Sequence, residues 1–306
     1  MKTSVLGSST IRVSEIGFGT SKLASLATGL TKRQARRLLD RADELGITFF
    51  DSADSYGQGS AEDLLGAFCK DKRDRVIISS KAGFRFTRAG GLLKFIKPIA
   101  AQVLSKVKAG RHLVSSIREG APQLKLISQS FEPDYIGTAI QDSLRRLRTD
   151  YLDIFFLHNP PVDAVSNPVL SELLRQRKRA GQIRSFGVST GDPEVLAAAC
   201  SFEGFEIVQV PINRLTVPAL GKRLSECAAH GMGIVANQVF GSGRLLADGT
   251  SRPPESFIGF AKAVPGVSSI IIGTTRSAHL EDNVVASCRT TMVSEVGDVS
   301  FDGARP

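Results

Sequence analysis

The chain has 306 residues, of which 42% are hydrophobic and 23% are charged, values that are ordinary for a folded globular protein. No stretch approaches 18 consecutive apolar residues, and the N-terminus lacks the apolar core of a secretory signal, so we expect no transmembrane segment and a cytoplasmic location. The four cysteines are widely scattered, with no CxxC pair and no His/Cys ligand spacing, which indicates reduced thiols and no metal site.

The net charge of +9 is concentrated in one segment. Residues 84–130 contain nine Lys or Arg and one acidic residue, so the rest of the chain is nearly neutral. A nucleic-acid-binding protein normally carries a broader basic surface with base-stacking aromatic residues. We therefore expect no nucleic-acid partner.

Short β-rich runs alternate with helical patterns along the chain. Each run is nearly continuous in apolar residues, as expected for parallel strands buried on both faces. The runs are Ile16–Thr20, Ile47–Asp51, Val76–Lys81, Asp153–His158, Arg184–Ser189, Ile207–Pro211, Gly233–Asn237 and Ser269–Gly273. Between the first two runs, Thr31 to Gln34 form a capping box and Gly46 ends the helix. Pro133, Pro168 and Pro193 are placed for first helical turns.

This alternation predicts a parallel sheet, either closed as a barrel or open and doubly wound. An open dinucleotide-binding sheet should carry GxGxxG after its first strand, and the chain has none there. Eight strands fit a (β/α)₈ TIM barrel, so we expect one domain over residues 1–306, with an N-terminal β-hairpin before Ile16. One connection, after the third strand, is too long by about 45 residues for a βα unit. Apolar residues from Leu92 to Val107 recur there at helical spacing, which predicts a basic helical insertion over residues 84–130.

Polar residues interrupt the apolar strands where those strands end. Asp51, Lys81 and His158 close the second, third and fourth strands, and Tyr56 lies in the loop after Asp51. In a (β/α)₈ barrel the strand ends and the following loops build the active site. Each residue alone has a structural explanation, as a turn cap, a solvated strand end, loop packing or a hydrogen-bonded histidine. Their convergence on one face predicts a catalytic site.

Five short stretches, spread over nearly the whole chain, resemble the aldo-keto reductase family. The stretches are Phe49-Phe-Asp51-Ser-Ala-Asp-Ser-Tyr56-Gly, Ser79-Ser-Lys81, Ser143-Leu-Arg-Arg-Leu147, Asp150-Tyr-Leu-Asp153 and Leu157-His158. The resemblance implies a catalytic tetrad of Asp51, Tyr56, Lys81 and His158. Tyr56 would be the general acid, with its pKa lowered by Lys81, which Asp51 holds in place. His158 would orient the substrate oxygen.

Two loops near the end of the chain are candidates for phosphate binding. They run from Phe240 to Arg244 and from Gly273 to Arg276, after the seventh and eighth strands, where such barrels often bind phosphate. The alternative is a pair of Gly-rich turns with solvated arginines. The family resemblance favours a cofactor, NADP or else NAD, and it implies these contacts: Gly19, Thr20, Asp51, Ser189, Gln209, Asn237, Phe240, Gly241, Ser242, Arg244, Gly273, Thr274, Arg276 and Asn283.

The predicted function is NAD(P)H-dependent reduction of an aldehyde or ketone, or oxidation of the corresponding alcohol. The alternative is a cofactor-sensing, non-catalytic binding subunit on the same barrel. For the insertion we consider three interpretations: a lid over the substrate pocket, an amphipathic surface that contacts an anionic membrane or a partner protein, and a helix with a solvated basic face.

Overall fold

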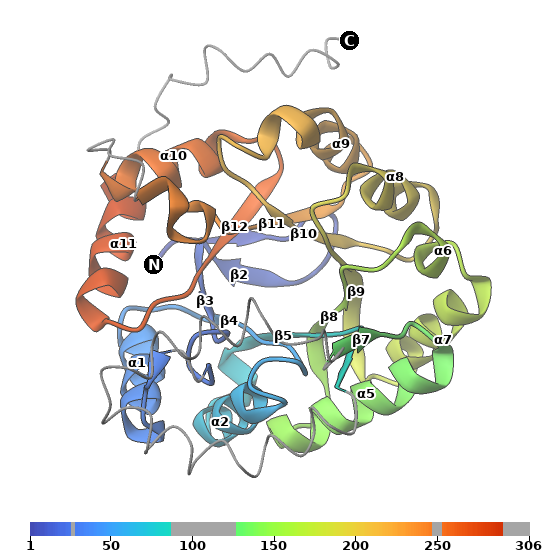
Figure 1. Cartoon of the computed structure of the whole chain (residues 1–306), viewed down its shortest axis with the longest axis horizontal. Helices are drawn as coiled ribbons and strands as arrows, with labels where there is room; N and C mark the ends of the chain where they lie inside the picture. The colour runs from blue at the N-terminus through green and yellow to red at the C-terminus, as the bar shows by residue number, and fades with distance from the viewer. Residues whose placement is uncertain (26–27, 87–126, 247–252, 290–306) are drawn as a thin grey trace, which may run out of the picture.

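The strands of this computed structural model close into a parallel barrel surrounded by helices (Figure 1). The structure describes residues 1–25, 28–86, 127–246 and 253–289. The order of strands around the barrel is β3-β4-β5-β8-β9-β10-β11-β12, and β12 pairs again with β3. Their bounds are Ile16–Gly19, Phe49–Asp51, Ile77–Ala82, Leu152–His158, Ile183–Ser189, Ile207–Pro211, Gly233–Asn237 and Val267–Ile272. The predicted barrel is confirmed, and each predicted run overlaps one strand.

Helices follow the barrel strands, and α1, α5, α7 and α8 begin where the sequence predicts helix starts. The bounds are α1 Lys32–Glu44, α2 Ser60–Cys69, α5 Pro133–Leu147, α6 Val162–Val165, α7 Pro168–Arg179, α8 Pro193–Ser201, α9 Val217–Ala229, α10 Pro254–Ala263 and α11 Ser277–Arg289, with 3₁₀ turns η2 Arg73–Arg75 and η3 Gly241–Leu246. The capping box of α1 is present. The Thr31 hydroxyl accepts from the Gln34 backbone N–H, and the Gln34 side-chain oxygen accepts from the Thr31 backbone N–H. Gly46 follows the end of this helix with a φ of +81°.

The register of the parallel strands gathers the predicted site residues at one end of the barrel. Gly19 pairs with Asp51, Lys81 with Phe156, and His158 with Ser189. All of these positions are at or near the carboxyl ends of their strands, so their side chains share the barrel mouth.

A short N-terminal hairpin closes the opposite end, as predicted. Strand β1 (Thr3–Val5) pairs antiparallel with β2 (Arg12–Ser14), and Figure 1 shows the hairpin across the middle of the ring of helices. Leu6, Ile11 and Val13 are buried against the apolar side chains inside the barrel. The Ser8 N–H donates to the Gly231 carbonyl at 2.8 Å, just before β11 begins. Hydrophobic packing therefore fills the end of the barrel that the hairpin closes, and the candidate site lies at the opposite end.

The described ends of the insertion form a β-ladder. Over residues 84–130 the sequence predicts a helical insertion, but β6 (Phe84–Phe86) and β7 (Ile127–Gln129) pair antiparallel, with Phe84 opposite Gln129. We call these two strands the stem. Each strand is only three residues long, Phe84-Arg85-Phe86 and Ile127-Ser128-Gln129, so neither shows a clear period in its sequence. The residues with helical spacing, Leu92 to Val107, lie outside the described residues.

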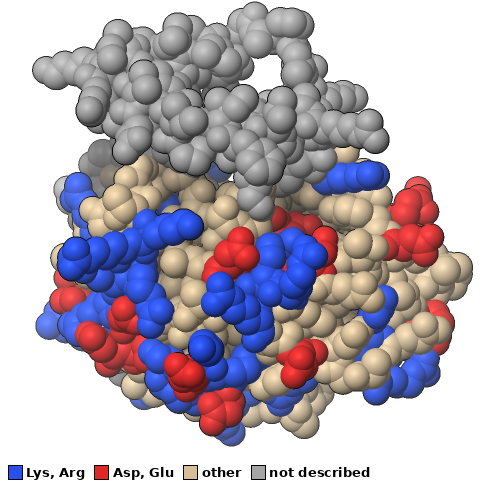
Figure 2. Space-filling model, turned by 90° about the horizontal axis from the view of Figure 1, so that it is seen from below, with Lys and Arg blue, Asp and Glu red and all other residues tan. Residues whose placement is uncertain are grey.

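Charges of both signs are interspersed on the face of the barrel seen in Figure 2. Because Asp and Glu side chains lie among the Lys and Arg side chains, the described part of this face carries no continuous basic stripe. Among the described residues, no helix is long and apolar enough to cross a bilayer.

Candidate active site

A buried ion pair lies at the centre of the barrel mouth. The Lys81 ammonium donates to both carboxylate oxygens of Asp51 and to the Ser52 carbonyl, each at 2.7 Å. Lys81 is 1% exposed and Asp51 is 4% exposed. Burial lowers the pKa of Lys81, but the charges of Asp51 and Tyr56 outweigh burial, so this pKa lies above its ordinary value. Lys81 therefore stays positively charged at neutral pH.

Tyr56 lies beside this pair, in the loop after β4. The Lys81 Nζ atom is 5.1 Å from the centroid of the Tyr56 ring, and the His158 ring stands edge-on to that ring at 6.1 Å between centroids. The effect of Lys81 has the direction that the sequence predicts, because its charge and hydrogen bond lower the pKa of the Tyr56 phenol, but burial acts the other way. Burial raises the pKa of Tyr56 more than the charge and the hydrogen bond of Lys81 lower it. The reason is that the phenolate loses more hydration on burial than one neighbouring cation replaces.

His158 is held in its neutral form. Burial and the nearby charge of Lys81 lower the pKa of this imidazole to about 3. Its Nδ1 atom is buried and has no hydrogen-bond partner within the described parts of the chain. The ring also packs edge-on against Phe84 of the stem, with 4.7 Å between centroids. A neutral imidazole has one N–H to donate, which suits a substrate oxygen at the barrel mouth.

The stem fixes the backbone that carries His158. The Gln129 side chain donates to the Asn159 carbonyl at 2.9 Å, and the Tyr135 hydroxyl donates to the Phe84 carbonyl at 3.1 Å. Gly83, just before the stem, has a φ of +142°, and a Cβ there would be 2.6 Å from the Phe131 ring and 3.1 Å from the His158 carbonyl. The base of the insertion is therefore one wall of the candidate site.

Three residues assigned by family resemblance to the cofactor form a polar network behind Asp51. The Asp51 Oδ1 atom accepts from Gln209 at 2.9 Å, and Gln209 in turn accepts from Ser189 at 2.8 Å. Thr20 donates to the Asp51 carbonyl through its N–H at 2.9 Å and its hydroxyl at 3.1 Å. Ser79 adds a further hydroxyl donor to Asp51 at 2.7 Å. These contacts fix the orientation of the carboxylate that holds Lys81.

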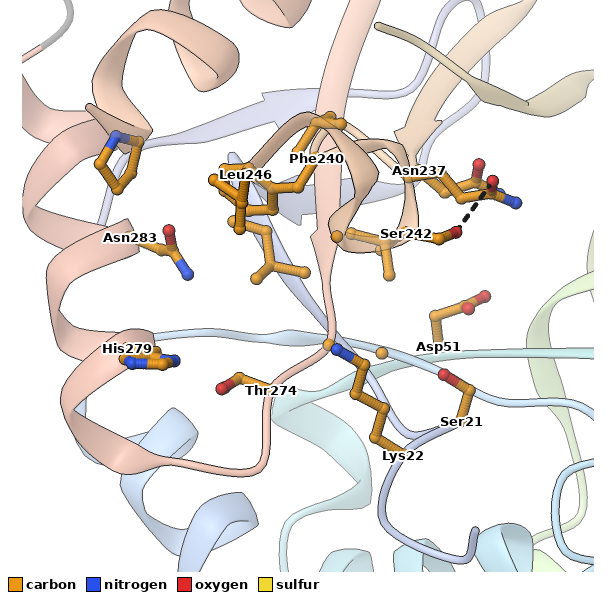
Figure 3. Close-up of a pocket in the computed structure, with 18 of the residues that line it drawn as sticks. Ser21, Lys22, Asp51, Asn237, Phe240, Ser242, Leu246, Thr274, His279 and Asn283 are labelled. Carbon is orange, nitrogen blue, oxygen red and sulfur yellow. Dashed lines mark hydrogen bonds between the residues drawn. The ribbon is translucent and has the colours of Figure 1, made fainter. Parts of the chain in front are cut away.

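A cavity of about 580 Å³ opens beside Asp51 and Tyr56 (Figure 3). It lies between the ends of β3, β11 and β12 and the first half of α11. Residues predicted for cofactor binding line much of it: Gly19, Asp51, Asn237, Phe240, Ser242, Gly273, Thr274 and Asn283. Gly241 shapes the turn beneath Phe240 and is buried, with a φ of +57°.

Two predicted anion contacts, the side chains of Arg244 and Arg276, are exposed and are not among the residues that line this cavity. Lys22 and Asp282, which the sequence analysis did not single out, do line it, together with His279. Figure 3 shows the Lys22 side chain extending from the loop after β3 into the cavity, toward its centre. Its place two residues after Thr20, just past a strand end, was the signal in the sequence. Asp282 gave no such signal, because an acidic residue on a helix is normally a solvated one.

The residues around the cavity fit a dinucleotide. The Asn237 Oδ1 atom is buried in the wall and lacks a hydrogen-bond partner in the described residues, so it is available to a ligand N–H. A Cβ on Gly19 would be 2.9 Å from the Ile271 side chain, so glycine lets the backbone line the cavity here without a steric clash. The first turn of α11 borders the cavity, where free N–H groups suit an anion. The volume is also typical of a small-molecule site.

A second acidic residue, the partly buried Asp54, lies just behind the tetrad. Its N–H donates to the Lys81 carbonyl at 3.0 Å. Glu62 is fully buried nearby and pairs with Arg146 at 2.6 Å between Nε and Oε2. Burial, and then the negative charge of Glu62, raise the pKa of Asp54 to about 7. Asp54 therefore titrates near neutral pH, close to the candidate catalytic groups.

Comparisons with known proteins match one family over most of the chain. The family model described as "Aldo/keto reductase family" matches residues 15–258. D-threo-aldose 1-dehydrogenase from a Pseudomonas species is 26% identical over 249 residues, which are 79% of this chain and 70% of that protein. The 6-dehydroglucose reductase of Novosphingobium aromaticivorans is 29% identical over 260 residues, covering 81% of this chain and 71% of the relative.

Among solved structures, the holo form of an aldo-keto reductase from Bacillus halodurans superposes with a TM-score of 0.75 at 25% identity, covering 96% of this chain and 93% of that one. The family match covers most of the chain, and the whole barrel superposes. The chain therefore belongs to the aldo/keto reductase family, whose members are NAD(P)H-dependent oxidoreductases of carbonyl and alcohol substrates.

Proposed function

We propose that this chain reduces an aldehyde or ketone, or oxidises the corresponding alcohol, with Tyr56 as the general acid and base. The observation that carries the proposal is the convergence of Tyr56, Lys81, Asp51 and His158 beside one end of a cavity that fits a dinucleotide. Carbonyl reduction needs hydride at carbon and a proton at oxygen. The bound nicotinamide would supply the hydride, and this chain would supply the proton.

The protonation states of Tyr56, Lys81 and His158 support the proposal that this chain supplies the proton. Because burial keeps the pKa of Tyr56 above its ordinary value, the phenol carries its proton at neutral pH and can donate it. The Lys81 charge then stabilises the phenolate that proton transfer leaves behind. Neutral His158 can donate its N–H to the substrate oxygen and orient the carbonyl. Asp51 keeps Lys81 charged and fixed in position.

For the cofactor we propose NADP in preference to NAD. Thr274 and Asn283 would hold one end, and the Asn237 amide oxygen would accept from the nicotinamide end. The Lys22 ammonium in the cavity would meet the diphosphate. Arg276 is exposed just before α11 and would meet a 2′-phosphate, whereas Asp282 on α11 would repel that phosphate. The preference for NADP therefore depends on Arg276 outweighing Asp282.

The names of two relatives favour sugar-like substrates. One is an aldose dehydrogenase and the other a reductase of an oxidised glucose, so reactions in both directions occur among proteins similar to this one. The alternative of a non-catalytic sensing subunit, and a contact with a membrane or a partner, depended on the basic insertion, whose residues 87–126 lie outside the described residues. The groups gathered at the barrel mouth favour the enzyme.

The test measures NADPH and NADH oxidation with a panel of aldehydes, ketones and aldoses, for the wild type and for Tyr56→Phe. General acid catalysis contributes about 10²- to 10⁴-fold, so kcat should fall by that factor in the variant. Cofactor Kd, followed by fluorescence, should stay within about twofold because the substitution removes one hydroxyl from the wall. Tyr151→Phe is the matched control, since Arg73 packs on that ring away from the cavity. Undiminished turnover in Tyr56→Phe would refute the assignment.

A further inference from the structure

Two cysteines that are far apart in the sequence touch each other on the outside of the barrel. Cys200 in α8 and Cys227 in α9 have their Sγ atoms 3.1 Å apart. The two helices lie side by side in the ring (Figure 1) and pack against each other. The Met232 Sδ atom is 3.7 Å from the Cys200 Sγ atom. Because Met232 directly precedes β11, this contact lies at the end of the barrel that the N-terminal hairpin closes.

The two thiols differ in access and in acidity. Cys227 is fully buried, whereas Cys200 is only partly buried. A hydrogen bond from Cys227 lowers the pKa of Cys200 and outweighs the effect of burial, and the same contact raises the pKa of Cys227. Cys200 is therefore the more accessible thiol and the one that ionises first, and thiolates are the reactive form of cysteine.

The other two cysteines lack this arrangement. Cys69 is buried, and burial raises its pKa to about 12. Cys288 is exposed on α11, and no other cysteine contacts it in the described structure. Hydrophobic packing alone would explain one buried cysteine, but it does not require two sulfur atoms in direct contact at the edge of the solvent.

We propose that Cys200 and Cys227 form a peroxide-sensitive site that closes to a disulfide between α8 and α9. The Cys200 thiolate attacks hydrogen peroxide, the O–O bond breaks, and the sulfur becomes a sulfenic acid as hydroxide leaves. The Cys227 sulfur then attacks the Cys200 sulfur, its proton passes to the departing hydroxyl group, and water leaves. In total, two thiols and one peroxide give one disulfide and two waters, with two electrons passing from sulfur to oxygen.

Closing the bond needs only a small movement. An S–S bond is about 2.05 Å long, so the sulfur atoms must approach by roughly 1 Å, which side-chain rotation can supply. The linked residues are separated by 27 positions. Cross-linking a loop of this length removes freedom from the unfolded chain, and we expect the melting temperature to rise by about 5 °C. Because the pair lies at the closed end of the barrel, kcat should be unchanged.

The test exposes the full-length protein to hydrogen peroxide at about one equivalent, followed by alkylation, digestion and mass spectrometry without reductant. We expect a peptide linked through Cys200 and Cys227, the loss of two free thiols per chain, reversal by dithiothreitol, and the rise in melting temperature. Cys69→Ser, the matched control, should still form the link, and Cys200→Ser should not form it. Cys288→Ser removes the exposed thiol and should form the link undiminished.

One result would overturn the proposal in the wild-type protein itself, without relying on any variant to fold. That result is Cys200 oxidised to sulfinic acid while Cys227 remains available for alkylation. Links made only between chains, through Cys288, would overturn it equally.

Discussion

Two partly buried groups beside the candidate active site, Asp54 and His158, are predicted to offset each other in the pH dependence of stability. The pKa of His158 is lowered from 6.5 to about 3, chiefly by burial and then by Lys81. The pKa of Asp54 is raised from 3.8 to about 7 by burial and by Glu62, against the opposing charges of Arg146 and Lys81. The two groups titrate over nearly the same range of pH, but with opposite effects on folding.

The sign follows from which state binds the proton. Between pH 3 and 6.5 the unfolded chain protonates His158 and the folded chain does not, so the free energy of unfolding rises with pH. The slope is about 1.4 kcal/mol per pH unit, and the whole interval corresponds to about 5 kcal/mol. For Asp54 the folded state binds the extra proton between pH 3.8 and 7, so the free energy of unfolding falls as pH rises, by about 4 kcal/mol in all. In the wild type these two slopes nearly cancel.

Separate substitutions should expose each slope. The assay is urea unfolding between pH 4.5 and 8 for the wild type, Asp54→Asn, His158→Gln and the double variant. The unfolding free energy of Asp54→Asn minus that of the wild type should grow by about 1.4 kcal/mol per pH unit up to pH 7, because only the wild type must ionise this carboxyl group in the folded state. His158→Gln should show the opposite trend, and the double variant should parallel the wild type.

Asp63→Asn is the matched control, because Asp63 is exposed on the same helix as Glu62. Its curve should run parallel to that of the wild type, since the other carboxylates contribute equally to both proteins. A curve for Asp54→Asn that also ran parallel to the wild type would refute the reasoning, because it would mean that Asp54 titrates at the same pH in the folded and unfolded states.

Two further predictions concern the cofactor and the substrate. Arg276→Ala should lower kcat/KM for NADPH by about 10- to 100-fold, the factor expected for the loss of a charged hydrogen bond to a phosphate, and should leave kcat/KM for NADH unchanged. Asp282→Asn should raise the ratio of kcat/KM for NADPH to kcat/KM for NADH. Equal losses with both cofactors would show that Arg276 does not contact a 2′-phosphate. Gln129→Ala removes the donor to the Asn159 carbonyl and should raise KM for the carbonyl about tenfold while cofactor Kd stays constant. Ser128→Ala, the neighbouring change in the same strand, should keep the wild-type KM, and an equal effect of both substitutions would contradict a positioning role for Gln129.

The features that local sequence determines were predictable. Continuous apolar runs such as Leu152–His158 mark strands that are buried on both faces, and the Thr31 capping box marks a helix start, because both depend on residues close together in the chain. The polar residues at strand ends were predictable for the same reason, since parallel strands bring their carboxyl ends to one face.

Features that depend on packing between distant segments were not predictable. The contact between Cys200 and Cys227 exists only because α8 and α9 are neighbours in the ring, and nothing in their spacing indicates it. The raised pKa of Tyr56 depends on burial, which a loop sequence does not reveal. The β-strands at the ends of the insertion were missed because three residues are too few to show a period, although Phe84 and Gln129 are directly paired.

The ion pair of Asp51 and Lys81 is explained better by chemistry than by stability. Both groups are almost fully buried, and removing charges from water costs several kcal/mol per ion, so an apolar pair of the same volume would hold the barrel at least as well. Apolar side chains such as Phe49, Ile154 and Phe156 already fill the interior below. Asp51 is also constrained by donors from Ser79 and Gln209, which serve to fix its orientation. A fixed, buried positive charge beside the partly buried Tyr56 phenol suits the proposed proton transfer to a carbonyl oxygen.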